Sequence, residues 1–143
     1  DVYKRQAIGM ISNNYVPEWH ISPFGHSKYT LVRNQDQFDL LFDDMSDTQE
    51  FMHLGTGAQV DYYGGGKHCI VQLGDCSERT LIEVHGLLLH EAVHIWQRIK
   101  KLMREKKPSV EFEAYSIQCI AQDLFSMFKE SEVPDVLDKK TDC

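Results

Sequence analysis

Apolar residues recur every three or four positions between residues 81 and 102, which is the spacing of one helix face. The stripe consists of Leu81, Val84, Leu88, Ala92, Ile95, Ile99 and Leu102. Just before it, Thr80 and Glu83 have the spacing of a capping box, in which each side chain accepts a hydrogen bond from the other residue's backbone N–H. Pro108 cannot continue a helix. The pattern therefore predicts a helix from residue 81 to about residue 106.

A second helical pattern follows, and Ser109 is a suitable N-cap for it. Its apolar positions are Val110, Ala114, Ile117, Ala121, Leu124 and Phe128. Because the connection is short, we expect this helix to return antiparallel to the first and to pack along it. The polar residues from Glu130 onwards include Pro134 and predict a frayed tail.

The first half of the chain predicts strands and turns. Residues 29–32 and the alternating residues 68–73 have strand character, whereas the glycines between Gly55 and Gly66 predict a flexible loop. Strand 68–73 directly precedes the turn into the first long helix. We therefore expect an exposed sheet edge near that helix, where the backbone of an extended peptide could pair.

Residues 36–51 are acidic and carry apolar residues at helical spacing, which predicts a short amphipathic helix capped by Asn34 or Asp36. The fold class that follows is α+β, with a small sheet packed on a central helix and a second antiparallel helix after it. We expect one domain over residues 1–143. It would comprise a loop- and strand-rich part (1–79), the two helices (80–129) and a tail (130–143).

Composition narrows the classes of protein. The 143 residues carry a net charge of −7, which argues against nucleic acid as the main partner, and no apolar run approaches the roughly 18 residues of a membrane-spanning helix. The four cysteines show neither CxxC spacing nor the density of a disulfide scaffold. We expect reduced thiols and a cytoplasmic location.

The first helix carries the sequence HExxH at residues 90–94. Residues four apart lie on one helix face, so His90 and His94 can offer two imidazole nitrogens to one metal ion, and Glu91 can reach a water bound to that ion. Apolar residues surround the three, and burying such groups costs several kcal/mol unless they are paired or bound to metal. The pattern predicts a zinc site. The alternative is an amphipathic helix with two incidental histidines.

Two histidines leave a zinc site one protein ligand short, and the second helix begins with candidate carboxylates at Glu111 and Glu113. Here the chain resembles the gluzincin branch of the zincin metallopeptidases, in which HExxH is followed by a glutamate on a later helix, often as Glu-x-x-Ala. Sixteen residues separate His94 from Glu111, and residues 111–114 read Glu-x-x-Ala. Tyr115 stands where many members have Asp.

The resemblance covers residues 80–128, and the segments HEAVHxWQ and EFEAY are also similar to those of small zinc peptidases inferred from phage and bacterial genomes. It implies a zincin-like fold and a hydrolase that cleaves the amide bonds of a peptide or protein substrate. Zn²⁺ would be held by His90, His94 and Glu111, with Glu113 as the alternative third ligand. Glu91 would act as general base towards a zinc-bound water.

Several roles stay open at this point. A donor such as Tyr115 could stabilise the oxyanion, and Tyr62, Tyr63 and His68 are further candidates. If neither glutamate is the third ligand, His68, His20 and His26 come next. The competing class of function is a non-catalytic binding or regulatory domain that keeps the zincin fold and its metal. Oligomeric state and bond preference do not follow from the sequence.

Overall fold

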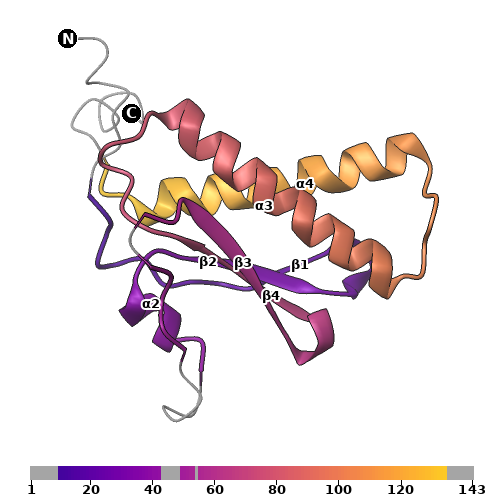
Figure 1. The fold of residues 1–143 in the computed structure, drawn as a ribbon, viewed down its shortest axis with the longest axis horizontal. Helices are drawn as coiled ribbons and strands as arrows, with labels where there is room; N and C mark the ends of the chain where they lie inside the picture. Colours follow the sequence, from indigo (N-terminus) through magenta and orange to yellow (C-terminus); the bar gives the residue numbers. More distant parts are fainter. Residues whose placement is uncertain (1–9, 43–48, 54, 135–143) are drawn as a thin grey trace.

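The computed structural model describes residues 10–42, 49–53 and 55–134, and it confirms the predicted α+β class. A four-stranded sheet is formed by β1 (His20–Ile21), β2 (Lys28–Val32), β3 (Ala58–Tyr63) and β4 (His68–Leu73). Helices α3 (Leu81–Leu102) and α4 (Val110–Ser131) lie together on one side of the sheet, and the short α2 (Gln35–Asp39) lies on the other (Figure 1). The expectation of one domain over residues 1–143 stays a prediction.

The strand order is β1-β2-β4-β3. Strands β2 and β4 run parallel, while β1 and β3 pair antiparallel with their neighbours. This corrects two expectations. Residues 55–66 are not one flexible loop, because they contain strand β3. The exposed sheet edge beside α3 is also not formed by the strand that precedes the helix. That strand, β4, is enclosed between β2 and β3, so the edge is β3.

The turn between β3 and β4 is the one-turn 3-10 helix η3 (Gly64–Gly66). All three glycines have positive φ values of 59°, 71° and 92°. Residues with a Cβ rarely adopt that backbone region, so the glycines allow the hairpin to close. A second 3-10 turn, η1 (Pro23–Gly25), joins β1 to β2.

Helix α3 begins as predicted, with the complete capping box between Thr80 and Glu83. It ends at Leu102, earlier than the predicted residue 106, because the chain turns at Arg104 with a φ of 60° before Pro108. Helix α4 begins after its predicted cap Ser109 and returns along α3 (Figure 1). Within the described chain, neither long helix nor any other is apolar enough to cross a bilayer.

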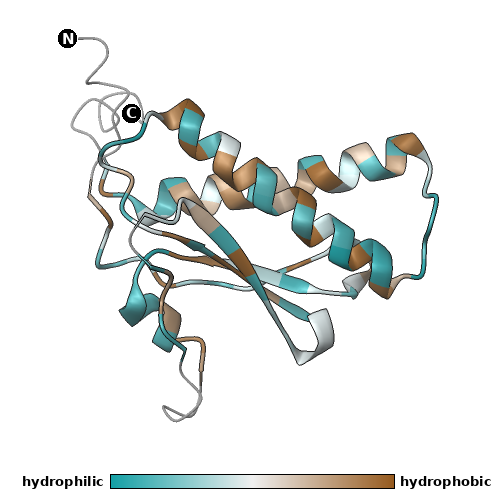
Figure 2. Ribbon diagram, in the orientation of Figure 1, coloured by the Kyte–Doolittle hydropathy of each residue, from teal (hydrophilic) through white to brown (hydrophobic). Residues whose placement is uncertain are grey.

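The main core lies between the helices and the sheet. Leu88, Ile95 and Ile99 of α3 are fully or almost fully buried against Leu31 and Val71 of the sheet. Burying each such aliphatic side chain stabilises the fold by about 1.5–3 kcal/mol. Hydrophobic and hydrophilic residues alternate around both helices, as a buried face and a solvent face require (Figure 2).

The apolar stripe of α4 is buried only in part. Ala121, Leu124 and Phe128 belong to the core, as predicted. At the start of the helix, however, Val110 is 79 % exposed and Ala114 is exposed as well. The first turns of α4 therefore project beyond the sheet, where no strand covers them (Figure 1).

Helix α2 is much shorter than the predicted helix over residues 36–51, and part of that range, residues 43–48, lies outside the described residues. Its N-cap is Asn34, whose side chain accepts a hydrogen bond from the Gln37 N–H. Phe38 packs with Val32 and Ile70 in a second, smaller core on the opposite face of the sheet.

Arg33 follows β2 directly and is 1 % exposed. Its guanidinium donates hydrogen bonds to the carbonyl oxygens of Leu73 and Gly74, to the Ser131 hydroxyl and to the Glu132 carboxylate, at 2.8–2.9 Å. Burial raises the pKa of Glu132, and Arg33 opposes that rise. The cluster joins the end of α4 to the sheet.

The two ends of the described chain also meet. The Ser12 N–H donates to the Ser131 carbonyl and the Val133 N–H donates to the Met10 carbonyl, each at 2.7 Å, around a bridge between Ile11 and Glu132. The predicted frayed tail is thus held as far as this bridge. Residues 135–143 lie outside the described residues.

Candidate active site

His90 and His94 lie one turn apart near the middle of α3, and their rings face each other at 77°. The two Nε2 atoms are 3.1 Å apart. Two histidine nitrogens that each bind one zinc ion at about 2.05 Å with tetrahedral geometry are separated by about 3.3 Å. The two nitrogens are therefore about as far apart as two ligands of one zinc ion, and a metal held between them stays a prediction.

A neighbouring amide orients one ring of this pair. His94 Nδ1 lies 3.0 Å from Gln97 Oε1, one helical turn further on. An amide oxygen can only accept, so this contact places the proton on Nδ1 and leaves the Nε2 lone pair directed at His90. Histidine ligands of metals almost always have such a hydrogen bond on the second nitrogen, where it fixes the tautomer.

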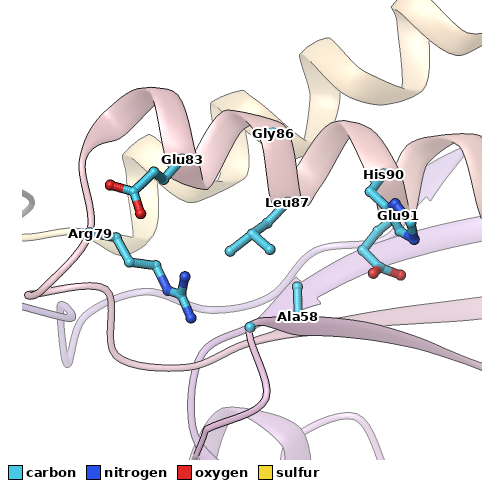
Figure 3. A pocket seen from close by; sticks show the side chains of 8 residues that line it. Ala58, Arg79, Glu83, Gly86, Leu87, His90 and Glu91 are labelled. Atoms are coloured by element: carbon cyan, nitrogen blue, oxygen red, sulfur yellow. The ribbon is translucent and has the colours of Figure 1, made fainter.

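Glu91 projects from the adjacent part of the helix towards β3 and is only 6 % exposed (Figure 3). Burial raises the pKa of its carboxyl group, His90 and His94 oppose the rise, and Asp61 of β3 adds to it. The expectation that apolar residues enclose all three motif side chains is wrong. His90 is exposed and His94 is half-buried, because their face of α3 is covered by neither the sheet nor α4.

The two candidate third ligands lie apart from the histidine pair. Glu113 accepts a hydrogen bond from Trp96 Nε1 at 2.8 Å and lies 3.4 Å from Lys100 Nζ, and the Trp96 bond is the main reason that its pKa is lowered. Trp96 is two residues beyond His94, about 200° away around α3. Glu111 is exposed, and its carboxylate makes no hydrogen bond or ion pair with the described chain.

No group of three or more His, Cys, Asp or Glu side chains that could hold a metal occurs within residues 10–42, 49–53 and 55–134. The structure thus brings His90, His94 and Glu91 together without adding Glu111 or Glu113. The identity of the third ligand stays a prediction.

The remaining candidates are dispersed. Tyr115 is 66 % exposed on α4, and the Tyr62 hydroxyl donates to the His94 carbonyl at 3.3 Å while the Arg98 guanidinium lies over its ring. His68 packs edge-on against Trp19, and His20 Nδ1 lies 3.7 Å from an Asp123 oxygen. Tyr63 packs in the smaller core, and His26 is exposed. Of these side chains, Tyr62 contacts the motif, through the backbone carbonyl of His94.

A groove of about 500 Å³ runs from His90 and Glu91 towards the start of α3, between that helix and the start of β3 (Figure 3). Its other lining residues are Gly57, Ala58, Arg79, Glu83, Gly86 and Leu87. The motif thus lies at one end of a groove bordered by the edge strand of the sheet. This is the arrangement in which an extended peptide could pair with a strand while one of its bonds lies beside Glu91.

Comparison with known proteins finds no match. No family model, curated protein or solved structure matches the chain.

Apart from His90 and Glu91, the lining residues of the groove are absent from the site candidates that the sequence pattern suggests, and these are Gly57, Ala58, Arg79, Glu83, Gly86 and Leu87. The alternation of apolar and polar residues from Ala58 to Tyr62 was the available signal for β3, but glycines on both sides obscure it. Arg79 directly precedes the helix cap. Its position in the chain alone does not indicate which way its side chain points.

Proposed function

We propose that the protein is a zinc-dependent peptidase of zincin-like, gluzincin type, in which His90 and His94 hold the metal and Glu91 is the general base. The observation that carries the proposal is the pair of Nε2 atoms 3.1 Å apart, with a buried carboxylate on the next residue. A buried carboxylate without a cationic partner costs free energy. A catalytic role accounts for its presence between two ligand histidines.

Zinc held there would supply a water of pKa about 7 and would polarise the scissile carbonyl. Glu91 then takes the water's proton and passes it to the leaving nitrogen, and its raised pKa suits a group that must accept and release a proton. The peptide lies in the groove along β3, which pairs only with β4 within the described residues. Gln97 keeps the His94 ring in the ligand tautomer.

Glu111 remains our proposed third ligand, with Glu113 as the alternative. Glu113 would have to give up its contacts with Trp96 and Lys100, whereas Glu111 has no partner in the described structure to give up. Ligation by Glu111 would require the projecting first turn of α4 to approach the histidine pair. Val110 and Ala114 of that turn are exposed, but the movement would also have to break the packing of Phe112 on Trp96. It would break the bonds of Glu113 to Trp96 and Lys100 as well.

A non-catalytic metal-containing binding or regulatory domain is the second candidate. The lack of a third donor beside the histidines within the described residues does not favour it over the peptidase, because closed zinc sites have four protein ligands. Glu91 weighs against it, because a site that only binds metal has no use for a buried carboxylate between its ligands. For either function we keep the cytoplasm as the proposed location.

The test begins with elemental analysis of protein purified without chelators. We expect about one zinc per chain, its loss in His90→Ala and His94→Ala, and its retention in His26→Ala, which removes an exposed histidine elsewhere. Folded protein without metal would refute the proposal. Turnover of a peptide library by the wild type but not by Glu91→Gln supports the peptidase, since an amide of the same size cannot accept the water's proton. Zinc without turnover would favour the binding domain.

A further inference from the structure

Arg79 lies at the far end of the groove from Glu91, and it is the one permanently cationic side chain among the described lining residues. Its guanidinium makes no hydrogen bond or ion pair with any residue that the structure describes. In Figure 3 the side chain extends below α3 towards the start of β3. The five N–H donors of the planar Arg79 guanidinium therefore have no partner among the described residues and are available to a ligand in the groove.

The nearest carboxylate does not occupy these donors. Glu83 lines the same end of the groove, but its Oε1 accepts hydrogen bonds from the Thr80 N–H at 3.2 Å and the Thr80 hydroxyl at 3.0 Å. These two bonds, in that order, are the main causes of its lowered pKa, and Arg79 contributes less. In Figure 3 the Glu83 carboxylate points away from Leu87, so the inner side of Arg79 is left open.

Gly86 supplies a second, independent observation. A glycine inside a helix is less favourable than alanine, and this one has no positive φ that would require it. A Cβ at this position would have no atom within 4 Å, so close packing does not require glycine either. Because Gly86 has no side chain, the groove stays open on the helix side between Arg79 and His90.

Gly57, on the opposite wall, is required by close packing instead. A Cβ there would lie 2.9 Å from Leu87 Cδ2 and 3.5 Å from Arg79 Nη2. The backbone just before β3 therefore approaches Leu87 and the guanidinium closely, and any larger residue would push into one or the other. Gly57 is thus packed against Leu87, Gly86 leaves open space above the helix, and the groove that both line forms a passage from the motif to Arg79.

The length of this passage follows from the helix. Glu83 and His90 are seven residues apart on nearly the same face, which is about 10 Å along the axis. An extended peptide advances about 3.3 Å per residue, so about three residues span the distance. We propose that the groove selects substrates with a carboxylate about three residues from the cleaved bond, and that Arg79 binds this carboxylate through its guanidinium fork.

This inference rests on the proposed peptidase function. The carboxylate is either the side chain of Asp or Glu or the free C-terminus of the substrate, since both present the same two oxygens. Arg79 is thus a specificity residue, because it acts on the substrate at a distance from the reacting atoms.

The test is the cleavage profile of a mixed peptide library, read by mass spectrometry, for the wild type, Arg79→Gln, Arg79→Glu and the control Arg104→Gln. Arg104 is exposed in the loop after α3. We expect the wild type and the control to favour an acidic group at the third residue from the cut by about tenfold. Arg79→Gln should lose that preference, and Arg79→Glu should favour Lys or Arg there instead.

A second library with amidated C-termini separates the two sources of the carboxylate. If the preference persists, the side chain is bound, and if it disappears, the C-terminus is bound. A Gly86→Leu variant checks the passage itself. It should melt at a higher temperature, because leucine favours the helix and its Cβ meets no neighbour, and yet cleave the preferred peptides at least tenfold more slowly.

Failure of the peptidase function and failure of carboxylate binding by Arg79 give different results. Cleavage that does not depend on Glu91, or no cleavage at all, overturns the peptidase and the inference with it. Glu91-dependent cleavage without an acidic preference overturns the inference alone. So does an acidic preference that survives Arg79→Gln, or full activity in Gly86→Leu.

Discussion

The surroundings of Arg33 and those of the histidine pair differ in how far their polar atoms are satisfied. Arg33 is enclosed, and its donors are taken by two carbonyl oxygens, a hydroxyl and a carboxylate. His90 is exposed and His94 is half-buried, and their Nε2 atoms face each other across 3.1 Å. A neutral His90 can donate its Nε2–H to the lone pair on His94 Nε2, so one proton completes the contact, and a metal could replace that proton. Donors that are all taken by buried partners indicate a structural role, whereas two accessible nitrogens that can exchange a proton for a metal indicate binding.

The largest effect is expected from replacing Arg33. Arg33→Met should lower the free energy of unfolding by about 3–5 kcal/mol, because it leaves Glu132 buried without its cation. Urea unfolding followed by circular dichroism measures this. Arg33→Met/Glu132→Met should recover much of the loss, and Arg104→Met should change little. Folded Arg33→Met should still bind zinc like the wild type. A loss below about 1 kcal/mol would contradict the structural role of Arg33.

The next largest effect is expected at the third ligand. Glu111→Ala should weaken zinc binding by at least the roughly 10- to 100-fold that follows loss of an outer-shell partner. Glu113→Ala is the matched control, with a small effect on zinc, because that carboxylate is held by Trp96. A competition titration with a zinc indicator measures both. The reverse order would reassign the ligand to Glu113. No effect in either variant would direct the search to His68, His20 and His26.

The smallest effect concerns the orientation of His94. Gln97→Ala removes the acceptor of the Nδ1 hydrogen bond and should weaken zinc binding by about tenfold, the lower end for an outer-shell partner, because the site is exposed. Gln97→Glu keeps an acceptor and should bind at least as tightly as the wild type. Thermal stability should hardly change in either variant. Equal zinc affinity in all three proteins would show that Gln97 has no orienting role.

Both long helices and the histidine pair could be predicted because their signals are local. Apolar periodicity, the Thr80 cap and the i, i+4 spacing all lie within a few residues of what they determine. The same holds for β4. Strand β3 could not be predicted because its alternating pattern is short and is flanked by glycines, which are Gly55, Gly57 and residues 64–66. Its formation also depends on pairing with β4, which the local sequence does not show.

Arg33 and the third ligand could not be predicted, for a related reason. The partners of Arg33 lie 40 to 99 residues away, and nothing beside it in the chain distinguishes it from a surface arginine. The choice between Glu111 and Glu113 depends on how α4 is rotated. That rotation is set by contacts with α3, such as Phe112 against Trp96, which no pattern along α4 reveals.

The meeting of residues 10–12 with residues 131–133 bears on how the molecule opens locally. Each segment holds the other by backbone hydrogen bonds, and Arg33 reaches Ser131 and Glu132, so neither end can detach alone. We expect the amide protons of Ser12 and Val133 to exchange with deuterium at similar rates, as one cooperative unit. In Arg33→Met both should exchange faster together. Independent rates for the two amides would show that the ends open separately.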